Sequence, residues 1–248
     1  MDGVPLIFIE HHLSHASSAY YQRPFNESAV ILTLDGSGDG LSATVSIGEG
    51  FKIKRIAETV FYDSLSNNLY SEITGYLGMK RWEHEYKVMG LAPFGRDDGL
   101  IDEFRKVIRI NPQRPLEFQN TFGAYLYQVT DKLSKVLIGK RFDNIAFGTQ
   151  NYFEELVVAW VKNAIAETGI NNVVAAGGAF LNVKANKKIR ELKEVNKFFV
   201  YPAADDGGTP VGAALEGYVI WCRQKNISPQ IEKIKDLYYG RQFTDNEI

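Results

Sequence analysis

The segment SAVILTLDGSGDG, residues 28–40, joins a run of apolar and β-branched residues to a glycine-rich turn. The run over 28–34 predicts a buried strand, and the Asp-Gly pair that follows is typical of a turn. Two later segments, SATVSIG (42–48) and KIKRIAETVFY (52–62), alternate like strands of an antiparallel meander. We therefore expect this part of the chain to form a sheet.

The segments on either side of this meander add strands and helices. We expect PLIFIE (5–10) to be a short buried strand and 13–22 to be helical. A helical pattern spans 64–77, and Gly78 can end it. The clearest helix covers 149–169, where apolar residues recur at i, i+3, i+4 and i+7.

The rest of the chain divides into a loop, an insertion and two repeated α/β steps. Residues 79–98 are rich in Gly, Pro and charge and predict a long ordered loop, and 99–150 predict a helical insertion. After residue 170, a strand, a glycine turn and a helix follow one another twice. This order predicts an α/β protein with mixed sheets.

Composition excludes several classes of protein. The chain has 248 residues, enough for one large domain or two lobes, and its net charge of −2 argues against nucleic acid as a partner. Its one cysteine, Cys222, excludes an internal disulfide and a cysteine metal site. There is no signal-peptide pattern and no apolar run long enough to span a membrane. We expect a cytoplasmic protein.

Three of the four histidines lie within five residues, in the segment IEHHLSHASSAY (9–20). On a helix, His11 and His15 project from the same face, which lets two imidazoles share one metal ion. The alternative is a pair of surface or helix-capping histidines. A metal would also need a third ligand from elsewhere in the chain.

Three glycine turns are candidate phosphate or nucleotide sites. LDGSGDG (34–40) can cradle a phosphate with backbone N–H groups, although alone it favours a hairpin turn. GGAFLN (177–182) lies between a strand and a helix, where a nucleotide can approach, but it lacks the dinucleotide spacing. PAADDGGTPVG (202–212) is either a capped helix start or a metal-binding aspartate beside a phosphate site.

Taken together and in this order, five motifs resemble the O-carbamoyltransferase family of the nodulation protein NodU and of the enzymes for cephamycin, novobiocin and tobramycin. They are HHLSHASSAYYQRPF, LTLDGSGDG, EYKVMGLAPFG, GGAFLN and PAADDGGTPVGAAL. The resemblance runs from His11 to about Ile220 and implies an actin-like ATPase core. That core is ribonuclease H-like (ASKHA), is related to the threonylcarbamoyl-transfer enzymes TsaD/Gcp, and has two lobes with mixed sheets.

The resemblance also implies roles for single residues. The metal ligands would be His11, His15 and Asp206, with Fe²⁺ as the expected ion and Zn²⁺ or Mn²⁺ as alternatives. His12 and Lys87 would be catalytic. Lys87 would contact phosphate or carbamoyl, and His12 would contact the acceptor or a neighbouring group, the alternative being that His12 only packs. The nucleotide, as ATP or carbamoyl adenylate with Mg²⁺, would be bound by residues of the three glycine turns: Asp35, Gly36, Ser37, Gly38, Gly177, Gly178, Asn182, Gly207 and Gly208.

The activity implied is transfer of a carbamoyl group, from carbamoyl phosphate via carbamoyl adenylate, to a hydroxyl of a small molecule. Residues 1–98 would be the remainder of the first lobe, incomplete at the N-terminus, followed by a helical insertion (99–150) and the second lobe (151–225). The tail (226–248) would lead toward a YrdC-like domain absent from this chain. We therefore expect activity to need a separate YrdC-like domain or N-terminal chain as partner.

Two other functions remain open from the sequence. The first is a nucleotide-binding subunit or fragment without activity of its own, which docks on a partner that supplies the missing parts. A tRNA threonylcarbamoyl-transfer relative is the other alternative, although the slightly acidic charge balance and the KVMGLAPFG loop favour the small-molecule family.

Overall fold

A five-stranded mixed sheet forms the centre of the protein. The computed structural model describes residues 6–238, 240–245 and 247. The strands follow the order β3-β2-β1-β6-β7, with bounds β1 Ala29–Gly38, β2 Leu41–Glu49, β3 Lys52–Val60, β6 Asn172–Ala176 and β7 Lys197–Val200. The first three strands pair antiparallel, whereas β6 lies parallel to both β1 and β7. The expected α/β fold with a mixed sheet is confirmed.

Strand β1 divides its side chains between the two faces of this sheet. Val30, Leu32 and Leu34 belong to the larger apolar core, while Ala29 and Ile31 belong to a second core on the other face. Successive side chains of a strand point to opposite faces, so both faces of β1 are buried. Burial on both sides explains why this segment is continuously apolar rather than alternating.

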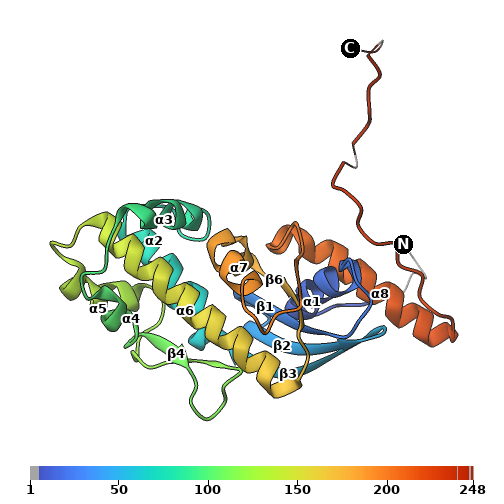
Figure 1. Ribbon diagram of the computed structural model, residues 1–248, viewed down its shortest axis with the longest axis horizontal. Coiled ribbons are helices and arrows are strands. Elements are labelled where there is room, and N and C mark those ends of the chain that lie inside the picture. Colours follow the sequence, from blue (N-terminus) through green and yellow to red (C-terminus); the bar gives the residue numbers. More distant parts are fainter. Residues whose placement is uncertain (1–5, 239, 246, 248) are drawn as a thin grey trace.

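Helices cover both faces of the sheet (Figure 1). Helices α1 (His11–Gln22) and α8 (Thr209–Lys225) pack together on the side of the second core. Helix α6 (Phe142–Thr168) lies over the larger core and continues into a helical part of the molecule. The other α-helices are α2 (Glu72–Tyr76), α3 (Glu85–Leu91), α4 (Leu100–Phe104), α5 (Tyr127–Leu137) and α7 (Val183–Arg190), and η2 (Ser66–Ser71) is a π-helix.

Three segments differ from the expectations. Residues 6–10 of PLIFIE form no strand, and Phe8 is 88% exposed, because no neighbouring strand pairs with this segment; Pro5 lies outside the described residues. The expected loop 79–98 contains helix α3. The insertion 99–150 contains a hairpin of β4 (Ile108–Ile110) and β5 (Phe118–Asn120) besides its helices, since strands this short give little periodic signal.

The division into lobes also differs. The boundaries at 98 and 150 put β1–β3 and β6–β7 in separate lobes, but β1 and β6 are hydrogen-bonded neighbours from Val30↔Val173 to Thr33↔Ala176. These strands therefore build one sheet, and the segment between them is an insertion on one side of it (Figure 1). The pairing lies between residues far apart in the chain, so no local pattern reports it.

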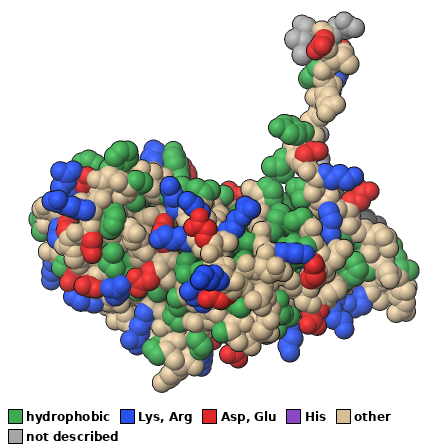
Figure 2. All heavy atoms as spheres, viewed as in Figure 1, with side chains coloured by type: hydrophobic (Ala, Val, Ile, Leu, Met, Phe, Trp, Pro, Cys, Tyr) green, Lys and Arg blue, Asp and Glu red, His purple; other side chains and the backbone are tan. Residues whose placement is uncertain are grey.

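The outer surface carries charges of both signs. In the view of Figure 2, basic and acidic side chains are interspersed, and the tail after α8 extends away from the body. None of the described helices has the length and apolar character needed to cross a bilayer.

Helix α8 lies close to the backbone of α1 at Gly212. A Cβ atom built at Gly212 would lie 1.8 Å from the carbonyl oxygen of Ser14, so only glycine fits there. Gly217, on the same helix, has no atom within 4 Å of such a Cβ. The packing of the helix that carries the histidines therefore depends on a residue almost two hundred positions away in the chain.

We predict that Gly212→Ala lowers the free energy of unfolding by about 1–3 kcal/mol, because backbone atoms cannot move aside as a flexible side chain can. The matched control Gly217→Ala should leave stability unchanged or raise it by up to about 1 kcal/mol, the helix-propensity gain of Ala over Gly. Denaturant unfolding of the three proteins measures both effects. Equal midpoints for the two variants would contradict the close approach.

Candidate metal centre and ligand cavity

The histidine segment forms the first turns of α1. The side chain of Glu10 caps the helix by accepting a hydrogen bond from the Leu13 amide (2.7 Å), and Asp39 accepts one from the His11 amide (2.8 Å). The helix thus begins at His11, and the four-residue spacing brings His11 and His15 to the same side. Their ring centroids lie 4.7 Å apart.

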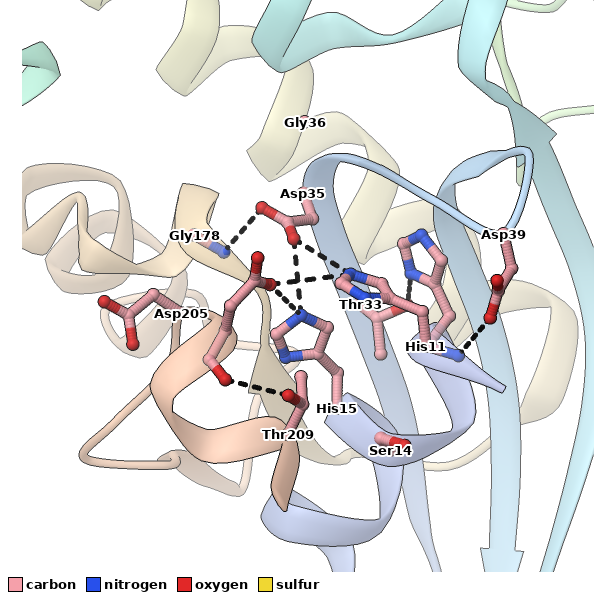
Figure 3. A network of polar contacts seen from close by, with 12 residues as sticks. His11, Ser14, His15, Thr33, Asp35, Gly36, Asp39, Gly178, Asp205 and Thr209 are labelled. Carbon is pink, nitrogen blue, oxygen red and sulfur yellow. Dashed lines mark hydrogen bonds and ion pairs between the residues drawn. The ribbon is translucent and has the colours of Figure 1, made fainter. Parts of the chain in front are cut away.

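Two aspartates from distant segments meet these imidazoles (Figure 3). Asp35, near the end of β1, places Oδ2 3.1 Å from His11 Nε2 and 3.3 Å from His15 Nε2. Asp206, at the turn before α8, places Oδ1 3.6 and 3.3 Å from the same two atoms. The structure thus brings together His11, His15 and Asp206, the three expected ligands, and adds Asp35, which we had expected to bind nucleotide.

The spacing of these four groups fits a single metal ion. Their candidate ligand atoms all lie within 4.8 Å of one another. Bonds of about 2.0–2.2 Å to one ion place neighbouring ligands about 3.0–3.5 Å apart, close to the observed separations. Two imidazoles with two carboxylates form a mixed N/O donor set that suits Fe²⁺, Zn²⁺ or Mn²⁺.

The charges of the four groups are strongly linked. The hydrogen bond that His11 donates to the Asp35 carboxylate raises the pKa of His11 above its usual value. Burial opposes ionisation of Asp35, but hydrogen bonds from His11 and His15 outweigh it and hold its pKa below the usual range. Burial and the nearby Asp35 carboxylate raise the pKa of Asp206. Two carboxylates this close repel each other, and a cation between them removes that repulsion.

His12 lies away from the cluster. Its Nδ1 is 2.8 Å from Thr33 Oγ1, which in turn is 2.6 Å from Thr44 Oγ1, and burial lowers the pKa of His12 to about 4. The ring is fully buried between α1 and the sheet. These contacts connect the helix to β1 and β2. They leave the His12 ring without contact to the acceptor substrate.

A cavity of about 630 Å³ opens beside the cluster and shares Asp35 and Asp206 with it. Four more of the expected nucleotide residues line this cavity: Gly36, Ser37, Gly178 and Asn182. The Asn182 side chain caps α7 by accepting a hydrogen bond from the Ala185 amide and exchanges hydrogen bonds with Gln150, both of 2.9 Å.

The other expected glycines shape the backbone and do not line the cavity. A Cβ at Gly38 would lie 2.1 Å from the ring of His11, so glycine makes room for that ligand. Gly177 adopts φ +105°, a backbone conformation that favours glycine, beside the carbonyl of Leu34. Gly207 donates a hydrogen bond to Asp205, and Gly208 packs against Tyr201.

Lys87 is exposed on α3 and does not line the cavity, although Glu83 and Glu85 of the same motif do. Most of the remaining lining residues were missed from the sequence. They come from η2, the loop before α3, α3 itself, the segment before α5, and α6: Ser66, Asn67, Tyr70, Ser71, Trp82, Tyr86, Tyr125, Leu126 and Phe153. The unusual composition of EHEYKVMGLAPFG was the one signal near them.

Comparison with known proteins identifies relatives. A family model described as "Carbamoyltransferase N-terminus" matches residues 1–215. The nodulation protein NolNO of Sinorhizobium fredii is 32% identical over 97% of this chain and 35% of its own length. The nodulation protein NolO of Bradyrhizobium diazoefficiens is 28% identical over 94% of this chain and 41% of its own length. The chain thus spans less than half the length of these curated relatives.

Solved structures share the fold. The crystal structure of HypF from T. kodakarensis superposes with a TM-score of 0.56 and 16% identity, over 88% of this chain and 37% of that one. A full-length HypF in a phosphate- and nucleotide-bound form gives a TM-score of 0.51 and 17% identity, over 87% of this chain and 43% of that one. These likenesses confirm the expected actin-like fold.

We predict that the purified protein binds about one divalent transition-metal ion per chain. Removing a ligand in His11→Ala or His15→Ala should weaken binding by at least the ~10–100-fold that changes around a metal site produce. His84→Ala is the matched control, since His84 lies outside the cluster. Elemental analysis after dialysis measures the bound ion. Equal metal content in His15→Ala and His84→Ala would contradict the assignment.

Proposed function

Because the chain belongs to the family described as carbamoyltransferase N-terminus, we propose that it is the core in which a carbamoyl group is transferred to a hydroxyl of a small molecule. The donor would be carbamoyl adenylate, derived from carbamoyl phosphate and ATP. The observation that carries the proposal is the cluster of two imidazoles and two carboxylates at one side of a cavity large enough for ligands. The same juxtaposition favours an enzyme core over a simple nucleotide-binding subunit.

In this proposal His11, His15 and Asp206 hold the ion, with Asp35 as a fourth ligand and Fe²⁺ as the expected metal. When bound, the ion supplies Lewis-acid stabilisation of negative charge on carbonyl or phosphate oxygens. The residues around the ion fix the place where this negative charge on the bound ligand is stabilised. Gly178 donates its amide to Asp35 (3.2 Å), which holds the carboxylate at the edge of the cavity.

The adenine nucleotide would lie in the cavity, with its phosphates near the Gly36–Ser37 turn and its adenosine toward Asn182. A full-length HypF that shares the fold is described as phosphate- and nucleotide-bound, which supports a nucleotide as the ligand. The described lining of the cavity contains five carboxylates (Asp35, Glu83, Glu85, Asp205 and Asp206) and neither Lys nor Arg. The phosphate charge must therefore be balanced by cations, so nucleotide and metal should bind together.

We assign no chemical step to His12 or Lys87. His12 is a positioning residue, because its hydrogen bond to Thr33 orients the helix that carries His11 and His15. The acceptor hydroxyl would attack the carbamoyl carbon, its proton would pass to a base or to water, and adenylate would leave. In this step the C–O bond between the carbamoyl carbon and adenylate breaks as the new C–O bond to the acceptor forms.

We predict that ATP binds only when a divalent ion is present. Calorimetry should show binding with Mn²⁺ or Fe²⁺ and loss of binding after chelation, because no basic side chain lines the described cavity to replace the ion. His84→Ala should behave as wild type, and His15→Ala should bind weakly. ATP binding of equal strength with and without the ion would contradict this electrostatic argument.

The transfer itself can be tested with carbamoyl phosphate, ATP, Fe²⁺ and a separately supplied YrdC-like domain that forms carbamoyl adenylate. We expect AMP release that rises when a mixture of hydroxyl compounds is added and that falls to background in His15→Ala. Nucleotide binding without any acceptor-dependent AMP release would instead favour the nucleotide-binding subunit. Acceptor-dependent release by His15→Ala at the wild-type rate would overturn the proposed role of the metal centre.

A further inference from the structure

Apart from the negative charge of Glu83 and Glu85, the wall of the cavity built by residues 66–86 has no role in the proposal above. Its first part is the π-helix η2, Ser66–Ser71, which contributes Ser66, Asn67, Tyr70 and Ser71 to the lining. π-Helical turns are rare and often occur at functional sites. Its second part is Trp82, together with Glu83, Glu85 and Tyr86.

Trp82 is held in an unusual conformation at this wall. Its φ of 65° lies in the left-handed region, which is strained for a bulky residue, and 57% of its surface remains exposed. Glu85 accepts a hydrogen bond from its backbone amide (2.6 Å), and Asn67 accepts one from its indole Nε1 (3.0 Å). Asn67 in turn donates to the carbonyl of Gly36 (3.0 Å), which connects Trp82 to the turn beside the metal cluster.

The residue before Trp82 anchors the loop. Arg81 forms two hydrogen bonds with Glu72, Nε to Oε1 at 3.0 Å and NH2 to Oε2 at 3.2 Å, and the Glu72 side chain is fully buried. The guanidinium lies 4.7 Å from the ring centre of Tyr127. A Cβ at Gly75 would lie 2.2 Å from it, so glycine leaves the space it needs. A bidentate ion pair of this kind fixes the orientation of Arg81, and it thereby holds the strained backbone of the adjacent Trp82 in place.

The groups that this wall offers define the ligand. Ser66 Oγ is buried and has no hydrogen-bond partner among the described residues, so it can bond a ligand hydroxyl. Glu83 and Glu85 add carboxylate acceptors; Lys80 pairs with Glu83 from outside the lining. With neither Lys nor Arg in the described lining, an anionic group would be repelled here. The indole offers a flat apolar face for a ring.

We propose that Trp82, Ser66 and Glu85 form the acceptor subsite, which binds a ring compound that carries several hydroxyl groups and no negative charge. Trp82 is the specificity-determining residue, because its face contacts the ring while Ser66 and Glu85 bond the hydroxyls. This inference rests on the proposed function, since it assigns the acceptor to one wall of the same cavity. It leaves the turn at Gly36 and the segment at Gly178 to the nucleotide.

Three sugars with one ring and different charges test the subsite. They are glucose, glucosamine and 6-deoxy-6-sulfoglucose, whose sulfonate is a poor metal ligand and so cannot bind through the metal centre. Saturation-transfer NMR on the metal-loaded chain should show weak binding of the neutral and cationic sugars and about tenfold weaker binding of the anionic one. Trp82→Ala should weaken binding of glucose and glucosamine by about tenfold or more.

Two further variants control for folding. Trp82→Phe retains a flat ring and should retain part of the binding, while Trp221→Ala removes a half-exposed indole on α8, outside the cavity lining, and should bind as wild type. Metal content and ATP binding, measured on the same samples, should be unchanged in all three Trp variants. That readout separates this inference from the proposed function, because a loss of metal or ATP binding in wild-type protein counts against the proposed function, whereas a loss of sugar binding alone counts against the subsite.

Three results would overturn the subsite. They are binding of the sulfonate sugar as tight as that of glucose, sugar binding unaffected by both Trp82 variants, and no detectable binding of any of the three sugars to wild-type protein that binds metal.

Discussion

The two-sided burial of β1 is the constraint on which the rest of the structure depends. Its parallel pairing with β6 and antiparallel pairing with β2 place Asp35 beside Gly178, at the edge of the sheet where α1 and the turn before α8 also begin. One face of the strand packs on the core beneath α6, and the other packs on α1 and α8. A one-residue slip of this strand would exchange the two faces and remove Asp35 from the histidines.

The position of α1 follows from this sheet and in turn sets the positions of the candidate metal ligands His11 and His15. His12 and Thr33 join the helix to β1, and Gly212 lets α8 approach the backbone at Ser14. Gly38 makes room for the ring of His11. Each contact restricts a different degree of freedom of the helix, so the imidazoles can meet Asp35 and Asp206 with little side-chain adjustment. Preorganisation of this kind favours metal binding, since less conformational entropy is lost when the ion binds.

The cavity beside the centre combines two kinds of wall. One is made of backbone turns and small residues, suited to close approach of phosphate, and the other of aromatic and acidic side chains on the insertion. The segment between β3 and β6 is anchored by the ion pair Arg81–Glu72, whose carboxylate is buried, and is tied to the sheet through Asn67 and Gly36. Variation between β3 and β6 can therefore change the cavity wall without replacing the four candidate metal ligands, which lie on α1, β1 and the turn before α8.

Much of the candidate site was determined by the sequence alone. Periodicity predicted β1–β3, α1 and α6, the spacing of His11 and His15 predicted a shared helix face, and the order of the motifs indicated the family. The resemblance, rather than any local pattern, pointed to Asp206 and not Asp205. Only the tertiary structure showed that Asp35 joins the cluster, that β1 and β6 share one sheet, that residues 6–10 form no strand, and that Trp82 faces a cavity. The physical reason is separation along the sequence. Helix and strand periodicities arise from neighbouring residues, whereas these four features depend on pairing and packing between segments far apart in the chain.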